Sequence, residues 1–443
     1  MFGDMTSLLA FIFVLGVLIF VHELGHYLMA RKIGVRVLTF SLGFGPKLLS
    51  VTRGGTDYCV SAIPLGGYVK MAGENPDDPR SGADDEFLSK TKWQRFQVLI
   101  MGPLMNLVLA VVVMAVVLYQ GADVPSYEQQ PPVVGSVEED SPAERIGILP
   151  GDLIVSVAGT PVDTWERFFV AVMPKAEREI ALVVERDGRR MTLDVIPDAQ
   201  TEFDVGDIGV LPSMHPEIIS VEPGGRADDA GILAGDVILA VDGEPVTRDK
   251  PIVDTINQSA EKPLRFTIRR DGTEREVVVT PALIGDVGLI GVGISPYELT
   301  RIDPGPLQAV QMSVQRNYEW SGLIFQTLWG LFTRETSPKQ LMGPVAIAQL
   351  SGGAARVGWV ALFSLMAMIS LNLGILNLMP IPVLDGGHIL ILGMEGLSGR
   401  DFSLQIKEKL LFAGFAVLLM LMITVIYNDL TRIAWIERLM PWR

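Results

Sequence analysis

The sequence predicts a polytopic α-helical membrane protein with four transmembrane helices, a β-hairpin in one loop and two small β-rich domains inserted in another. Three observations predict this fold class. First, 49% of the 443 residues are hydrophobic and the mean hydropathy is +0.36, which is high for a soluble protein. Second, the apolar residues are concentrated in four uncharged runs. Third, the segment between the second and third runs contains an internal repeat.

The four uncharged runs have the length of membrane spans, which need about 20 mostly apolar residues. Three runs contain 27, 28 and 19 uncharged residues, and the first contains 17 before it continues to Ala30. We expect spans near residues 6–29, 97–119, 358–379 and 410–427. A cleaved signal peptide is the alternative for the first run, but the basic n-region and the cleavage site of such peptides are missing.

The distribution of charge sets the expected orientation. Residues 31–95 carry ten Lys and Arg, whereas residues 119–356 carry 20 Lys and Arg against 36 Asp and Glu. We therefore expect the first loop inside, the acidic segment outside and both termini outside. The net charge of −15 argues against nucleic acid as a partner. The single cysteine, Cys59, excludes an intramolecular disulfide and a zinc cluster built on cysteines.

Residues 1–122 form the first predicted part of the chain, two spans joined by a cytoplasmic loop at 31–96. Two stretches of this loop are rich in β-branched and aromatic residues, and Gly43, Phe44 and Gly45 break the pattern between them. They predict a β-hairpin. An exposed edge of such a hairpin could hold an extended peptide by backbone pairing. A hairpin with no part in substrate handling is the alternative.

The exported segment contains a tandem repeat with an offset of 84 residues. Gly147–Ile154 recurs as Gly231–Ile238, and the match extends without gaps as far as Gly209 and Gly293. Two copies of one β-rich domain follow, at residues 127–212 and 213–297.

The repeated pattern Gly-Ile-Leu-x-Gly-Asp-x-Ile resembles bacterial PDZ domains in their circularly permuted form. In that family a strand with an x-Gly-apolar sequence offers backbone amides to the carboxylate of a peptide. The residues that match this strand are Ile208, Gly209 and Val210 in the first copy, and Val292, Gly293 and Ile294 in the second. A small β domain that serves only as a spacer is the alternative.

The rest of the chain divides into residues 298–356 and residues 357–443. In the former, Val310, Val314 and Tyr318 recur at helical spacing, but nearby charges argue against a span, so we expect an amphipathic helix at the interface or packed on the domains. The latter contains the last two spans and a C-terminal tail.

The first span ends in an H-E-x-x-H motif formed by His22, Glu23 and His26. Positions i and i+4 share one face of a helix, so both imidazoles can reach one zinc ion. The intervening Glu23 can accept a proton from water at the metal. The motif lies at the end of an apolar run, where an unpartnered charge costs about 3 kcal/mol or more. A polar helix end at the membrane surface is the alternative.

A catalytic zinc ion usually has three protein ligands. Asp385 ends the third uncharged run after two prolines, on backbone that we expect to be irregular. Irregular backbone at membrane depth is tolerated when it is buried in protein or lines a cavity. His388 is a competing third ligand, and an ordinary Asp-Gly turn at the start of a loop is the alternative for Asp385.

Together these motifs resemble the site-2 protease family of intramembrane zinc metalloproteases, and the two PDZ copies match its RseP-like enzymes of Gram-negative bacteria. The resemblance rests on His22-Glu23-Leu24-Gly25-His26 in the first span and on Asn-x-x-Pro-x-Pro-x-Leu-Asp-Gly, which begins at Asn377. It implies that His22, His26 and Asp385 bind one zinc ion per chain and that Glu23 is the catalytic base. It also implies substrate-handling roles for Asn377, for Asn106 in the second span, and for Gly43, Phe44 and Gly45.

The resemblance further implies a multi-pass protein of the bacterial inner membrane, with periplasmic PDZ domains and an active site near the cytoplasmic side. Its substrates would be single-span membrane proteins, such as an anti-sigma factor that has already been cut once, and signal-peptide remnants. The PDZ pair would exclude substrates with bulky exported domains or bind partners. A zinc or proton transporter and a PDZ scaffold with an inactive membrane anchor are the two alternatives.

Overall fold

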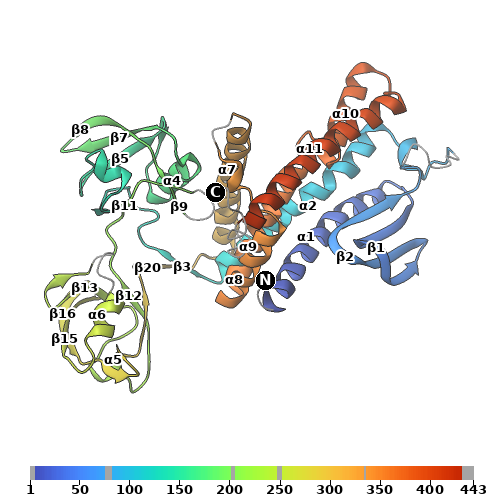
Figure 1. Cartoon of the computed structure of the whole chain (residues 1–443). Coiled ribbons are helices and arrows are strands. Elements are labelled where there is room, and N and C mark those ends of the chain that lie inside the picture. The colour runs from blue at the N-terminus through green and yellow to red at the C-terminus, as the bar shows by residue number, and fades with distance from the viewer. Residues whose placement is uncertain (1–4, 75–81, 201–204, 247–251, 334–335, 432–443) are drawn as a thin grey trace. The chain divides into compact units, whose positions relative to one another are not determined.

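The computed structural model describes residues 5–74, 82–200, 205–246, 252–333 and 336–431 (Figure 1). The chain divides into two compact units. One comprises residues 1–121, 303–334 and 338–443, and the other comprises residues 122–302 and 335–337. Each unit is described by itself below.

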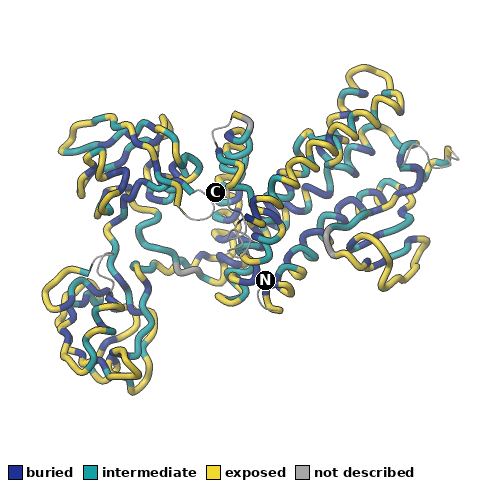
Figure 2. The backbone as a smooth tube through the Cα atoms, viewed as in Figure 1, coloured by how far each residue is buried: buried dark blue, intermediate teal, exposed yellow. Residues whose placement is uncertain are grey.

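Four described helices of the first unit are long and apolar enough to cross a membrane: α1 (Met5–Lys32), α2 (Lys92–Tyr119), α9 (Trp359–Asn377) and α11 (Leu404–Thr431). The core shared by α1, α2 and α9 contains Leu18, Met114 and Ala367. In α11 only 6% of the most apolar window is buried, as the exposed colour of Figure 2 shows. An apolar helix exposed on nearly every side is suited to contact with lipid.

The remaining helices of this unit are α7 (Pro306–Phe332), α8 (Pro344–Val357) and α10 (Asp385–Ser398), with short 3-10 turns at Phe87–Ser89 and Pro338–Gln340. α7 packs on the span helices, because Ser313 Oγ donates a hydrogen bond to the Val111 carbonyl of α2 over 2.7 Å. Its opposite face exposes Leu307, Val314 and Tyr318. A helix thus spans the segment for which the sequence predicted one, but its buried side lies on α2 and α9, whereas we expected it at the interface or on the repeats.

The first loop folds into two long strands, β1 (Val37–Arg53) and β2 (Thr56–Met71). Residues 40–42 of β1 pair with residues 67–69 of β2 on one edge and with residues 58–60 on the other. The loop is therefore a small folded sheet, more elaborate than the simple hairpin expected from the sequence. Tyr27 of α1 holds the sheet by a hydrogen bond to Tyr58 over 2.5 Å.

The second unit contains two copies of one domain, preceded by β3 (Ala122–Pro125), which pairs with β20 (Leu299–Ile302). The first copy comprises β4 (Ser136–Val137), α3 (Pro142–Arg145), β5 (Leu153–Val157), β6 (Thr160–Pro161), α4 (Trp165–Val172), a 3-10 turn at Met173–Lys175, β7 (Ile180–Arg186), β8 (Arg189–Val195), β9 (Asp198–Gln200), β10 (Val205–Asp207) and β11 (Val210–Leu211). The second comprises β12 (Glu217–Val221), α5 (Arg226–Asp229), β13 (Val237–Val241), β14 (Glu244–Pro245), α6 (Ile252–Gln258), β15 (Leu264–Arg270), β16 (Thr273–Val279), β17 (Ala282–Ile284), β18 (Val287–Leu289) and β19 (Val292–Ser295).

Each copy has its own apolar core and the same buried ion pair. Trp165 and Phe168 fill the first core, and Phe266 fills the second. In the first copy Arg186 binds the buried Asp152 with both Nε and Nη2 at 2.7 Å. Arg270 binds Asp236 in the same way in the second copy. Hydrogen bonds to a buried carboxylate fix the Gly-Asp turn that the sequence repeats.

The repeat register differs from the one expected from the sequence. The counterpart of Gly209 is Gly291 and not Gly293, since both have a φ of +74°. Their carbonyls also accept equivalent hydrogen bonds at 2.8 Å, from the Glu138 and Glu222 amides. The reason is turn length: four residues, 201–204, separate β9 from β10, whereas two residues separate β17 from β18. The strand Ile208-Gly209-Val210 is thus matched by Ile290-Gly291-Val292, and the gap-free offset of 84 ends before it.

Candidate metal centre

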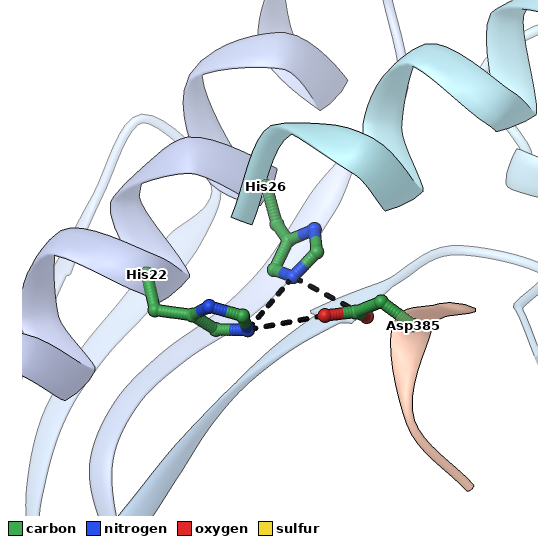
Figure 3. A group of neighbouring side chains, drawn as sticks. All are labelled: His22, His26 and Asp385. Carbon is green, nitrogen blue, oxygen red and sulfur yellow. Dashed lines mark hydrogen bonds and ion pairs between the residues drawn. The ribbon is translucent and has the colours of Figure 1, made fainter. Parts of the chain in front are cut away.

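The H-E-x-x-H motif lies in the last three turns of α1, and its two imidazoles face the first residue of α10, Asp385 (Figure 3). His22 Nε2 lies 3.2 Å from Asp385 Oδ2, and His26 Nε2 lies 3.5 Å from Asp385 Oδ1. The two Nε2 atoms are 3.3 Å apart. The backbone between Asn377 and Asp385 is irregular, as expected, but Asp385 itself is helical and begins α10.

These three donor atoms fit a zinc ion. Zinc takes nitrogen and oxygen ligands at about 2.1 Å in tetrahedral geometry, which separates neighbouring ligand atoms by about 3.4 Å. The separations here are 3.2, 3.3 and 3.5 Å. Among the described residues this is the one group of three His, Cys, Asp or Glu side chains whose ligand atoms lie within 4.8 Å of one another. Three protein ligands leave a fourth position for water or substrate.

The α2 helix fixes the second imidazole. His26 Nδ1 lies 2.8 Å from the Val98 carbonyl, and because a carbonyl accepts, Nδ1 carries the proton and Nε2 is left for a metal. Gly102 of α2 lies directly against the ring, where a Cβ atom would overlap the His26 imidazole. Glycine at this position therefore lets α1 and α2 approach closely enough to place His26 in the group.

Glu23 lies between the two histidines in the chain and is buried, with 9% of its surface exposed. The β2 strand lies against it: a Cβ atom added to Gly67 would lie 3.0 Å from Glu23 Cγ. Glu23 thus lies between its own helix, α1, and the edge of the loop sheet. This contact is one that the sequence did not reveal, because nothing in the Gly66-Gly67 pair indicates which side chain it meets.

The other expected site residues are distributed as follows. Asn106 of α2 is completely buried and its amide lies 3.3 Å from His22 Nδ1. Asn377 is half-buried at the last residue of α9. Phe44, 44% exposed, stacks on Tyr68 within the loop sheet, and Gly43 and Gly45 are its neighbours in β1. His388 lies one turn after Asp385 and is not a member of the group of three.

In the second repeat a cavity of about 820 Å³ lies beside β19 and α6. Val292, Gly293 and Ile294 line it, together with Ile290 and Gly291, which the sequence register had missed. The corresponding residues of the first repeat, Ile208 and Val210, are buried in its core. The signal that could have set the register is the pattern Gly-x-Ile-Gly-Val, which occurs at residues 206–210 and again at residues 288–292.

Known proteins match this chain over nearly its whole length. The model of "Peptidase family M50" matches residues 10–421. The chain is 33% identical to "Regulator of sigma-E protease RseP" of Escherichia coli, over 98% of this chain and all of that protein. It is 34% identical to the protein of the same name from Salmonella typhimurium, with the same coverage. It is 32% identical to a "Putative zinc metalloprotease" of Neisseria meningitidis, over 97% of this chain and all of that protein.

A solved PDZ domain of an SdrC-like protein from Listeria monocytogenes also matches, at 21% identity. The match covers 19% of this chain and 87% of that domain, with a TM-score of 0.17.

Proposed function

This chain belongs to peptidase family M50 and is an intramembrane zinc metalloprotease of the site-2 type, and from this premise we propose which residues act and on which substrates. His22, His26 and Asp385 hold one zinc ion per chain, and Glu23 is the catalytic base. The observation that carries this assignment is the group of three donor atoms at tetrahedral spacing, with a buried carboxylate on the same helix.

The chain's own residues account for the proton transfers. Zinc in this site would polarise the scissile carbonyl and activate the attacking water. Glu23 accepts the proton of that water and delivers it to the leaving amine. The Val98 carbonyl keeps His26 in the tautomer that a metal requires. Burial of Glu23 between α1 and β2 limits bulk water at the carboxylate, which strengthens its interaction with a developing charge.

The substrate is a transmembrane segment of a single-span protein, held as an extended strand. A peptide bond within a helix is shielded by the helix and must be unwound before attack. The edge of the loop sheet at Gly67 lies against Glu23 and offers backbone groups for pairing with an unwound segment. Gly43, Phe44, Gly45 and Asn377 are proposed to guide this segment, and Asn106 is considered separately below.

The two repeats are proposed to be periplasmic PDZ domains that select substrates by size or bind partners. The groove of the second repeat, beside β19 and α6, suits an extended peptide whose carboxylate meets the amides near Gly291. With the first loop cytoplasmic and the repeats exported, the chain is a multi-pass protein of the bacterial inner membrane with both termini periplasmic. Its substrates are then anti-sigma-factor-like proteins already cut once outside, as the name of the relatives suggests, and signal-peptide remnants.

Cleavage of a single-span substrate with a short exported tail by the purified chain tests this function. We expect the wild type to cleave, and Glu23→Gln to retain zinc and cleave about 10²- to 10⁴-fold more slowly. Glu319→Gln, an exposed glutamate of α7, is the matched control and should cleave like the wild type. Equal cleavage by the wild type and Glu23→Gln would refute the role of Glu23. Zinc flux across vesicles without any cleavage would favour a transporter.

A further inference from the structure

We propose that Asn106 is a positioning residue for His22, and that its amide oxygen accepts a hydrogen bond from the His22 Nδ1–H. This assignment rests on the proposed zinc ligands. It replaces the substrate-handling role that the family resemblance implies for this asparagine. Asn106 lies on α2 and is completely buried, so it is enclosed by protein at the back of the ligand group.

The tautomer of His22 follows from the geometry of its two nitrogens. Nε2 faces His26 Nε2 and Asp385 Oδ2, at 3.3 and 3.2 Å. A neutral imidazole that binds a metal through Nε2 carries its hydrogen on Nδ1. This Nδ1–H then needs an acceptor, since imidazole ligands of zinc almost always donate their second N–H to an oxygen.

The Asn106 amide is the group placed to accept it. Its Nδ2 atom lies 3.3 Å from His22 Nδ1, and two N–H groups cannot bond each other. Its Oδ1 atom is buried and has no hydrogen-bond partner among the described residues. The oxygen and nitrogen of an asparagine amide are assigned from the bonds they make. Rotation of the amide by half a turn places Oδ1 against the Nδ1–H and removes the clash of donors.

A second helix holds Asn106 in place. Ser370 of α9 is completely buried, and its hydroxyl donates to the Asn106 backbone carbonyl over 2.8 Å. The contact fixes α2 against α9 at the level of the ligand. His26 is held in a parallel way through the Val98 carbonyl of the same α2 helix. Both imidazoles therefore take their orientation from α2, one from a backbone oxygen and the other from a side-chain oxygen.

Zinc affinity, measured by competition with a chelator on the full chain, tests the proposal without any substrate. Asn106→Leu is close in volume and has no acceptor, and we expect its zinc dissociation constant to rise about 10- to 100-fold. Asn106→Asp keeps an oxygen at the same place and should bind zinc at least as tightly as the wild type. Asn317→Leu is the matched control, because Asn317 of α7 is also buried with an unpartnered Oδ1 but lies outside the ligand group. It should leave the dissociation constant unchanged.

Unchanged zinc affinity in Asn106→Leu would overturn the proposal, as would an equal loss in Asn106→Asp. Should the leucine variant not fold, Asn106→Ala, with the thermal unfolding of the metal-free protein measured alongside, provides the same comparison. The absorption spectrum of bound cobalt should change in the leucine or alanine variant and not in the aspartate variant. A failure of the proposed function gives a different result. The wild type would still bind zinc with the same affinity, but Glu23→Gln would cleave as fast as the wild type. Failure of the ligand assignment would appear as unchanged zinc affinity in His22→Ala.

Discussion

A buried carboxylate at the end of α11 caps the N-terminus of α8. Asp429 is 3% exposed and accepts hydrogen bonds from the backbone amides of Gly343, Val345 and Ala346, at 3.0, 2.9 and 3.3 Å. The first amides of a helix have no partner within the helix, and a carboxylate satisfies them and favours the positive end of the helix dipole. The cap joins two elements that are more than 80 residues apart in the chain.

Asp429→Ala should free these amides and loosen the start of α8. A buried amide left without its acceptor costs about 1–3 kcal/mol, so three amides together cost about 3 kcal/mol or more. A loss of 1–3 kcal/mol at one amide corresponds to a rise of about 5- to 150-fold in its hydrogen-exchange rate. Exchange measured by mass spectrometry on the full chain in detergent should show this rise at the amides of Gly343, Val345 and Ala346.

The control for this prediction is Thr424→Ala. Thr424 is a half-buried residue of α11 whose hydroxyl donates to the Met420 carbonyl of its own helix, and its loss should leave the exchange of α8 unchanged. Asp429→Asn, which keeps one acceptor oxygen, should lie between the wild type and the alanine variant. If the amides of Gly343, Val345 and Ala346 exchange at the wild-type rate in Asp429→Ala, Asp429 does not cap α8.

Two further predictions concern the loop sheet and the repeats. Gly67→Ala should slow cleavage while zinc binding is retained, because the new Cβ would press on Ile19, on the Ser41 carbonyl and on Glu23, and not on a proposed ligand. Gly393→Ala, in open space on α10, should cleave normally. Loss of zinc from Gly67→Ala would contradict this placement. Arg186 holds the pKa of Asp152 below its usual 3.8 through their hydrogen bonds. Because the folded-state pKa is depressed, this contribution to the stability of the first repeat is present above about pH 4 and is lost as the pH falls through the lowered value. Hydrogen exchange of the first core, corrected for the intrinsic rate, should rise below pH 4 in the wild type and vary less with pH in Asp152→Asn, with the second repeat as internal reference; equal pH profiles would contradict the assignment.

The spans and the ligand group could be predicted from the sequence because each has a strong local signal. Uncharged runs of 19 to 28 residues have few alternatives to a membrane helix, and two histidines four residues apart must share a helix face. Asp385 was a candidate because a catalytic zinc ion usually has three protein ligands, and the family resemblance favoured it over His388. What could be predicted was thus the kind of element and the chemistry of its polar residues.

The remaining features depend on tertiary contacts that carry no local pattern. The register of the second repeat shifts by two residues because one turn is shorter, and a gap-free comparison passes over so small a change. The contact of Gly67 with Glu23 and the bond from Ser370 to Asn106 join segments far apart in the chain. The packing of α7 on α2 was missed because Arg316 and Glu319 lower its hydropathy, although the face that meets α2 carries Ser313 and Ala309.

The ligand group also has a consequence for how the enzyme is made. His22 and His26 are among the first residues synthesised, but Asp385 follows His26 by 359 residues. At a synthesis rate of about 5–20 residues per second, roughly 20–70 s pass before the proposed third ligand exists. Both repeats are made during this time, while the proposed metal site is still incomplete. If His22, His26 and Asp385 hold the metal, the chain can cut membrane segments only after the elements proposed to select its substrates have been synthesised.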